Sequence, residues 1–430
     1  MREEVRRHRR MVGALMSWLP FLKLHEVRDP RSRQGRRWQL PTLLRAVLTG
    51  LVAGRKSLGE TESLISEMSP AVREKLRLPP ALSDTTARDL LVRISQFELR
   101  QVIHRMVRAA LRRGTLALVD FPFHVLVLDG KVTSIPSWDH HYAQMKTYDD
   151  GRQAHGLVRT TTAMLVSTEA KPVVDAIPIP AETNEMGIFP HVFESLCRRY
   201  GELFKLVTYD AGAASLANAQ LVADAGKFYL FALKNETRFL MQRAIACVGP
   251  DSGEFSRATT EDTLSDGSTV RRSVFVGKAK KGFKDWGHLR TVLRVRSDTF
   301  DRSGKLIATL DRYFISNLVH TEMAWGQWLL LVRRHWAVEN NAHWTLDAIY
   351  REDDHPWIEA SPKGVLAMML LRRIAYNITT CFRSVTQRSE EKRRFTGWKD
   401  LLRWFYNAFI AASAELLKGL RSREDAAASS

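Results

Sequence analysis

Apolar residues recur at helical spacing between residues 40 and 113. A proline stands at the first helical position of this segment, apolar residues follow three and four positions apart, and Gly54 ends the first run. A second start signal at Ser83 precedes a run whose apolar positions leave Arg88 and Arg93 on the surface. We expect this region to be helical. Its second run could read DNA, although an ordinary amphipathic helix packed on its neighbours explains it equally well.

From residue 123 the pattern changes to short runs rich in Val, Leu, Ile and Thr, which are typical of buried strands. The predicted strands are HVLVLDGK, LVRTTTAMLVS, KPVVDAIPI, KLVTYD and KFYLFALK. Residues 211–226 separate the last two, are rich in Ala and end in Gly, which predicts a crossover helix between two strands. The pattern therefore predicts a mixed α/β sheet.

The rest of the chain changes pattern twice more. Residues 250–318 are polar and strand-like, with turn signals at SDGS (265–268) and RSGK (302–305), so we expect a β-rich insertion. A long helical pattern follows in TEMAWGQWLLLVRRHWAVENNAHWTLD, and further helices begin at Pro362 and continue toward a tail, REDAAASS, that we expect to be disordered.

Composition limits the class of protein. With 430 residues, 45% of them hydrophobic, the chain can fill two or three cores. The apolar stretches are broken by charge before about 20 residues, so no membrane span is expected. The basic N-terminus has no cleavage signal after it, and Cys197, Cys247 and Cys381 are far apart, which favours a cytoplasmic protein with reduced core thiols over a disulfide framework or zinc cluster.

Charge points to a polyanionic partner. The formal net charge is +18 and the sequence pI is about 10.0. The basic excess is concentrated in residues 1–37, 271–296 and 372–400. Any single run could be a solvated helix face, but three runs around a nearly neutral remainder favour double-stranded DNA, because each contacted phosphate releases counterions.

Two aspartates stand where predicted strands end. Asp129 closes an apolar run before Gly130 and Lys131, and Asp210 closes LVTYD before small residues. Ligands bind at the carboxyl ends of strands in open α/β sheets, and a buried carboxylate needs a partner or a metal. Alternatively, each aspartate simply caps a loop or helix.

Glu339 adds a third carboxylate from the long helical pattern. Two aspartates and a glutamate form an all-oxygen set that suits Mg²⁺ or Mn²⁺ and does not suit zinc. Two such ions can activate a water or a 3′-hydroxyl on one side of a phosphodiester and stabilise the leaving oxygen on the other. This chemistry is DNA strand cleavage and strand transfer.

Four motifs resemble the successive signatures of DDE transposases from bacterial insertion sequences of the H-repeat-associated group. They are VLDGK (127–131), TYDAGAASLANAQ (208–220), FALKNE (231–236) and HWAVENNAHWTLD (335–347), and residues 27–65 resemble the helical segment that accompanies them. The resemblance implies an RNase H-like catalytic core in which Asp129, Asp210 and Glu339 hold two divalent ions, Mg²⁺ or Mn²⁺. It also implies a β insertion before Glu339, transposon ends and target DNA as partners, and a homodimer in the synaptic complex.

The resemblance suggests how the chain is divided. We expect an N-terminal helical, DNA-binding domain in residues 1–118 and the first part of the catalytic core in 119–250. The β-rich insertion would occupy residues 251–318, and the catalytic and C-terminal helices 319–425. A catalytically inactive or domesticated DNA-binding derivative and an RNase H-like nuclease without end specificity are the alternative functions.

The chain departs from related transposases around Glu339. They carry an Arg four residues before this glutamate and a Lys seven after it, whereas this sequence has His335 and Leu346. Phosphate contacts must therefore come from elsewhere, although some of the basic residues near the motifs could be surface charge only. The candidates are Lys131, Lys234, Lys278, Lys280, Lys281, Lys284, Arg333 and Arg334.

The other residues near Glu339 allow more than one interpretation. His335 and His343 share its helical face, but a His/Glu/His metal site would leave both aspartates unexplained and lacks the HExxH spacing. Trp336 and Trp344 are expected as core anchors more than as base-stacking platforms, and Asn340 as either a DNA contact or a surface amide.

Asp347 is the main rival to Glu339 as the third ligand, and it could instead orient a basic residue nearby. The denser acidic cluster at residues 352–354 is expected to lie in a solvated loop before Pro356, and so outside the site.

Overall fold

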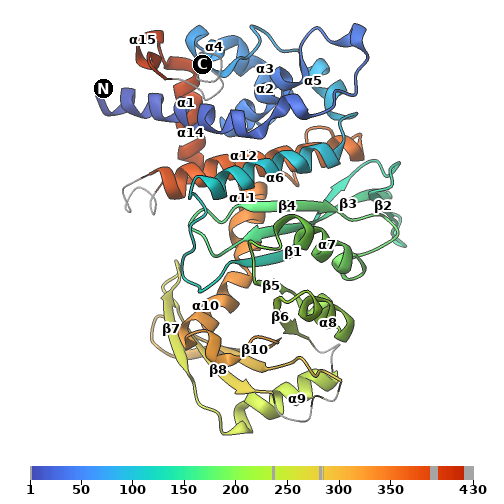
Figure 1. Ribbon diagram of the computed structural model, residues 1–430, viewed down its shortest axis with the longest axis vertical. Helices are drawn as coiled ribbons and strands as arrows, with labels where there is room; N and C mark the ends of the chain where they lie inside the picture. Colours follow the sequence, from blue (N-terminus) through green and yellow to red (C-terminus); the bar gives the residue numbers. More distant parts are fainter. Residues whose placement is uncertain (1, 235–237, 280–282, 284, 388–395, 421–430) are drawn as a thin grey trace.

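The computed structural model describes residues 2–234, 238–279, 283, 285–387 and 396–420. Its elements are arranged in three tiers along the long axis (Figure 1). Helices from both ends of the chain form one end, a sheet flanked by helices occupies the middle, and the long strands β7 to β10 form the other end.

The helical tier contains the helices predicted between residues 40 and 113, and helices near the C-terminus pack among them. Helix α12 contacts α2 and α6, and α14 contacts α1. The early helices are α1 (Arg2–Leu22), α2 (Leu40–Val52), α3 (Leu58–Glu67), α4 (Pro70–Leu76), α5 (Asp84–Leu91) and α6 (Gln96–Arg112). The late helices are α12 (Pro362–Cys381), the π-helical η8 (Phe382–Thr386), α14 (Trp398–Ala411) and α15 (Ala414–Leu417).

The sheet has the strand order β2-β3-β1-β5-β6-β10-β9-β8-β7, with β4 paired to β3. Strand β1 is antiparallel to β3 and parallel to β5, and β5 is parallel to β6 through the crossover helix α8 (Leu216–Asp224). The predicted fold class, an RNase H-like mixed sheet with flanking helices, is confirmed. The remaining core elements are β1 (Val125–Ile135), β2 (Ala143–Lys146), β3 (His155–Leu165), β4 (Val173–Pro178), α7 (Glu185–Tyr200), β5 (Leu206–Tyr209), β6 (Phe228–Leu233) and α9 (Arg238–Val248).

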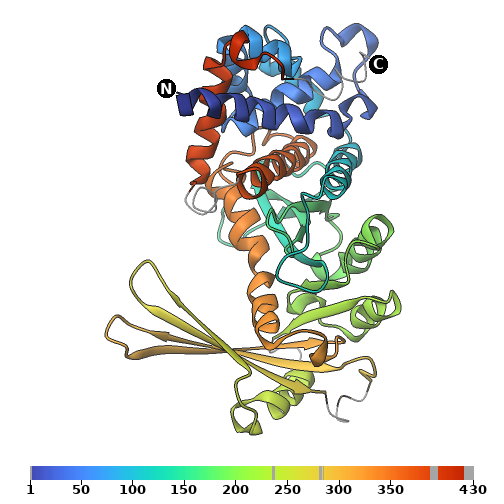
Figure 2. The same cartoon turned by 60° about the vertical axis from the view of Figure 1, so that its left-hand side comes forward.

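The strands of residues 250–318 extend this same sheet. They are β7 (Ala258–Thr263), β8 (Thr269–Lys278), β9 (Thr291–Phe300) and β10 (Leu306–Ser316), and β10 pairs antiparallel with β6. Gly267 (φ 83°) and Gly304 (φ 84°) take the left-handed conformation at the two predicted turns. The hairpin tips extend far from the rest of the molecule (Figure 2).

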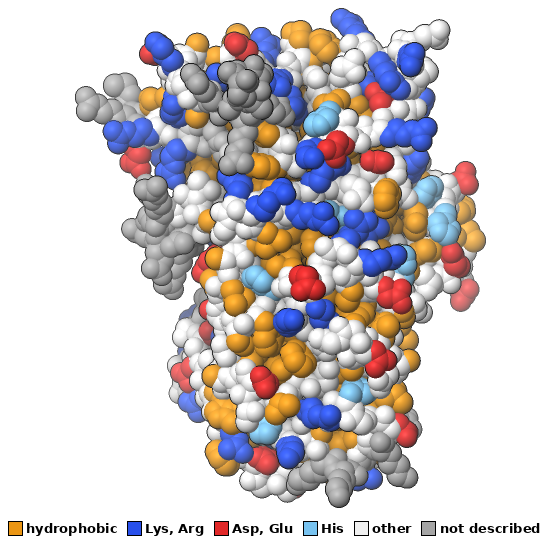
Figure 3. Space-filling model, viewed as in Figure 1, with side chains coloured by type: hydrophobic (Ala, Val, Ile, Leu, Met, Phe, Trp, Pro, Cys, Tyr) orange, Lys and Arg blue, Asp and Glu red, His pale blue; other side chains and the backbone are white. Residues whose placement is uncertain are grey.

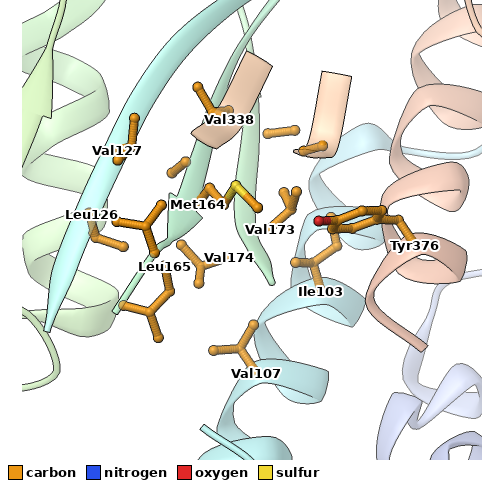
Figure 4. Packing of buried hydrophobic residues seen from close by; sticks show 14 of the residues in the cluster. Ile103, Val107, Leu126, Val127, Met164, Leu165, Val173, Val174, Val338 and Tyr376 are labelled. Atoms are coloured by element: carbon orange, nitrogen blue, oxygen red, sulfur yellow. The ribbon is translucent and has the colours of Figure 1, made fainter. Parts of the chain in front are cut away.

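A continuous hydrophobic core joins the helical tier to the sheet. Side chains of α6, such as Ile103, face side chains of β4, such as Val174, and Tyr376 of α12 packs close by (Figure 4). The segment Pro362–Thr386 is long and apolar enough to cross a membrane, and its apolar window is entirely buried within the protein. Charge interrupts this stretch as well, at Arg372 and Arg373 near the middle of α12, and both arginines are buried.

Candidate active site

Asp129 lies in the middle of a strand, which corrects the prediction that it ends one. Strand β1 continues to Ile135 because its antiparallel partner β3 pairs with it along this whole length. Pairing with the short strand β5 stops at Val127↔Thr208. Asp129 therefore lies beyond the last residue pair between β1 and β5. It is at the level of the residue that follows β5.

Asp210 is the residue that follows β5. Its Oδ1 accepts a hydrogen bond from the backbone N–H of Gly212 (2.9 Å), so it caps the short helix η3 (Ala211–Ala213). Its Oδ2 lies 3.6 Å from Nζ of Lys234. Capping therefore uses one carboxylate oxygen and leaves the other facing the pocket described below.

Glu339 lies in a π-helical turn, where a continuous α-helix was predicted. Helix α10 (Trp325–His335) is followed by the π-helical η7 (Val338–His343) and then by α11 (Trp344–Ala348). Single π turns inside helices often occur at functional sites. The wider turn breaks the predicted repeat of four, so that His335 and Glu339 line the pocket while His343 reaches Asp129 instead.

The three acids line one pocket of about 310 Å³. Burial raises the pKa of Asp129 to about 7, and the negative charge of Asp210 acts in the same direction. Burial also raises the pKa of Glu339, and both aspartates add to this shift. Because the carboxylates repel one another, this all-oxygen donor set fits a divalent cation. Among the described residues no three potential ligands are already close enough to form a metal cluster.

A fourth acid, Glu185 at the start of α7, lies beside this pocket and was missed from the sequence. Burial raises its pKa, and the charges of Asp129 and Asp210 raise it further. A Cβ on Gly130 would overlap the Glu185 carboxylate. The glycine in VLDGK is the local signal that something packs closely against β1 here.

Two basic residues share the pocket with the acids. Lys234 is a predicted phosphate ligand and is well exposed. Arg312 of β10 was not predicted, and its guanidinium lies 4.6 Å from the centre of the Trp336 ring. Pairing of Tyr313 with Leu233 brings Arg312 next to Lys234, and no sequence motif marks that pairing.

Lys131 is not available to DNA, contrary to the prediction. It is 6% exposed, and its ammonium donates hydrogen bonds to Asp347 (2.7 Å) and Asp353 (3.0 Å). Two carboxylates already surround this charge, so it serves to hold α11 and the following loop against β1.

The other predicted DNA contacts have different outcomes. Arg333 pairs with Asp262 (2.9 Å) and Arg334 pairs with Asp120 (2.8 Å), so surface acids of the protein itself partly neutralise both charges. Lys278 is exposed at the end of β8. Lys280, Lys281 and Lys284 lie outside the described residues.

The acids beyond Glu339 are engaged elsewhere. Asp347 pairs with Lys131 and does not line the pocket. Of the acids at 352–354, Asp353 and Asp354 are exposed in a turn, as predicted, but Glu352 is fully buried and pairs with Arg373 (2.8 Å), so the prediction of a solvated loop was wrong for Glu352. A buried guanidinium requires a buried counter-charge, and no local pattern showed that Arg373 would be internal.

The aromatic and histidine residues of this helix separate into two groups. Trp336 packs partly buried against the core, as predicted, but Trp344 is 52% exposed, so the prediction that it anchors the core was wrong. The Nδ1 atom of His335 lies 2.5 Å from Oγ1 of Thr208, and Nδ1 of His343 lies 3.2 Å from Oδ2 of Asp129. Burial lowers the pKa of both histidines, to about 4 and about 3. Both rings are therefore neutral near pH 7, and they help to position neighbouring side chains.

Comparison with known proteins assigns the chain to a family. A solved piggyBac transposase synaptic complex with hairpin DNA is similar at 11% identity and a TM-score of 0.39, over 97% of this chain and 81% of that chain. No curated protein sequence matches. Residues 121–378, more than half of the chain and all three pocket acids, match the family described as the transposase DDE domain. The chain therefore belongs to the transposase DDE domain family.

Proposed function

We propose that this protein is the transposase of a bacterial insertion sequence, which cuts DNA at the ends of the element and joins those ends to target DNA. The observation that carries the proposal is that Asp129, Asp210 and Glu339, from three distant segments, line one pocket. Two basic side chains, Lys234 and Arg312, line the same pocket. Members of this family generally use divalent metal ions. For this chain we propose two ions, Mg²⁺ or Mn²⁺, held by the three acids.

When bound, such ions would activate a water or a 3′-hydroxyl and stabilise the leaving oxygen of the phosphodiester. The side chains of the protein supply the positioning. The Gly212 N–H fixes one oxygen of Asp210, and His343 restrains Asp129. Arg312 and Lys234 are suited to hold phosphate oxygens, in place of the Arg and Lys that related transposases carry on the helix.

The test is incubation of the purified protein and Mg²⁺ with end-labelled DNA that contains the genomic flanks of its own gene. The expected products are nicks at short inverted repeats and strand-transfer joints. Cleavage without any end preference would instead identify an RNase H-like nuclease. Specific binding with no cleavage in either Mg²⁺ or Mn²⁺ would identify an inactive derivative.

Transposition must bring two DNA ends together, so we also propose that the active form is a homodimer. We further propose that it acts in the bacterial cytoplasm, where the chromosomal DNA is accessible. Sedimentation of the protein with and without end DNA tests the dimer, which requires two protein chains in the DNA-bound species.

A further inference from the structure

A second cavity, of about 500 Å³, lies between the segment after α2, the end of α11 and helix α14. It is lined by basic side chains from all three segments, and no acidic residue lines it. The basic residues are Arg55, Lys56, Arg351, Lys399 and Arg403.

Most of this charge is not neutralised by nearby acids. Among the described residues, the ammonium groups of Lys56 and Lys399 form no ion pair, although the backbone N–H of Lys56 donates a hydrogen bond to the Glu60 carboxylate (3.0 Å). The Arg55 guanidinium stacks on Tyr406, 4.4 Å from the ring centre. The pairs of Arg351 with Asp354 (3.6 Å) and Arg403 with Asp400 (2.7 Å) are solvent-exposed, and exposed pairs are weak. Cations gathered in this way repel one another, and a polyanion relieves that repulsion.

One exposed face of the catalytic helix connects this basic cavity to the acid pocket. Trp336 lines the acid pocket, Ala348 lines the basic cavity, and Asn340 and Trp344 are exposed between them. All four belong to the continuous helical stretch that runs from α10 through the π turn of η7 into α11, although the π turn shifts them from a strict repeat of four. At about 1.5 Å per residue, the stretch from Trp336 to Ala348 rises by no more than about 18 Å.

We propose that this face is the track of the DNA strand that is cut, and that the basic cavity binds the backbone of that strand away from the reacting phosphate. The proposal rests on the proposed function for the identity of the substrate. A rise of about 3.4 Å per nucleotide places the cavity about five nucleotides from the acid pocket. Trp344, which is 52% exposed, lies along the track and stacks on a base or sugar.

The first test measures binding of the full chain to a random-sequence DNA duplex without metal ions. In the Lys56→Gln/Lys399→Gln double variant, the slope of log affinity against log salt should become shallower by about 1.8, because each neutralised phosphate contributes about 0.9. The control is Lys146→Gln/Lys205→Gln, which removes two exposed lysines that line neither pocket. A double variant that keeps the parental slope would overturn the proposal.

The second test concerns Trp344 and the direction of the track. Trp344→Ala should bind a DNA fork with a single-stranded arm about tenfold more weakly, since base stacking on an aromatic ring contributes roughly that much. A photocrosslinker attached to Lys56→Cys should react about five nucleotides from the cleavage position mapped on the same DNA. Unchanged affinity for the fork, or crosslinks that are scattered along the DNA, would contradict the track.

These results separate the two proposals. A shallower salt slope in the double variant, together with a parent protein that never cuts DNA, would leave the track standing and contradict the transposase function. Normal cleavage at element ends with an unchanged salt slope would contradict the track alone.

Discussion

The carboxyl groups of Asp129 and Glu339 have raised pKa values because burial and neighbouring acids disfavour their charged forms. A divalent cation bound among these acids would favour their charged forms, because it would add positive charge to that of Lys234 and Arg312. At the scale of single residues, the proposed function therefore predicts that affinity for DNA and chemistry depend on different groups. Basic side chains are expected to bind phosphate, and the acids are expected to serve the reaction.

Asp129→Ala or Asp210→Ala should abolish strand cleavage and leave DNA binding intact. Without metal ions binding could tighten modestly, since the substitution removes repulsion between a carboxylate and phosphates. Gel-shift and cleavage assays on the same labelled DNA measure both effects. Cleavage near the wild-type rate in either variant would exclude these residues as metal ligands.

Glu339→Gln preserves the shape of the side chain and removes its charge, so Mg²⁺-dependent cleavage should fall by several orders of magnitude. Asp347→Asn is the matched comparison, because Asp347 pairs with Lys131 outside the pocket. That variant should retain a measurable rate. If single-turnover assays show the reverse order of cleavage rates, Asp347 would be the third metal ligand.

At the scale of elements, helices α2 and α3 approach closely at one glycine. A Cβ added to Gly50 would lie 2.7 Å from Cγ2 of Thr61, whereas a Cβ at Gly59 of α3 meets no atom closer than 3.8 Å. Gly50→Ala should therefore destabilise the protein by about 1–3 kcal/mol. Gly59→Ala should not destabilise it. Thermal unfolding of both variants gives the comparison, and equal melting temperatures would show that the two helices adjust freely.

A buried ion pair fixes helix α6 to strand β4. The Arg100 guanidinium donates two hydrogen bonds, of 2.8 and 2.7 Å, to the Asp175 carboxylate, which is completely buried. Burial alone would raise the pKa of Asp175, but the bonds and charge of Arg100, with His104 close by, hold it well below its ordinary value.

A carboxyl group with a lowered pKa in the folded state contributes stability that is complete above its unfolded pKa of about 3.9 and is lost as the pH falls below that value. Asp175→Asn should therefore lower stability at pH 7 by about 3–5 kcal/mol, because Arg100 is left buried and unpaired, and should weaken the acid dependence below about pH 4. Urea unfolding across this pH range measures both effects. Asp89→Asn, which breaks an exposed pair with Arg93, is the control and should cost less than about 1 kcal/mol. Similar losses in the two variants would contradict this role.

At the scale of the whole molecule, the net charge of +18 overstates the number of basic side chains that are available to bind DNA. Figure 3 shows Lys and Arg side chains gathered over the upper half of one face, around the helical tier. Several members of the basic runs are internal instead. Arg372 and Arg373 are fully buried, and Arg272 of the second run pairs with Asp262 (2.6 Å).

The lysines at positions 278, 280, 281 and 284 should bind the DNA backbone without reading bases, because an ammonium group is a point charge suited to phosphate. Replacing all four with Ala should flatten the salt dependence of affinity by about 0.9 for each phosphate that is no longer neutralised, equally for end DNA and random DNA. If this variant keeps the salt dependence of the parent protein, the four lysines are only solvated surface charge.

The sequence alone predicted the helices between residues 40 and 113, five of the core strands, the turns at Gly267 and Gly304, and the motifs that carry the family resemblance. It did not predict α1, β2, α7 or α9. The predicted features depend on neighbours along the chain, since hydrophobic periodicity and backbone preferences are local. The crossover helix after Asp210 was predicted for the same reason, because its Ala-rich run and final Gly stand between two apolar strands.

Only the tertiary structure decided which charged side chains lie next to one another. Pairing of β1 with β3 carried Asp129 past the end of β5, and pairing of β10 with β6 brought Arg312 into the pocket. Lys131 was neutralised by acids more than 200 positions away, and Trp344 was left exposed. The physical reason is that the partner that buries, neutralises or exposes a side chain comes from a distant segment, and no local spacing of residues encodes that interaction.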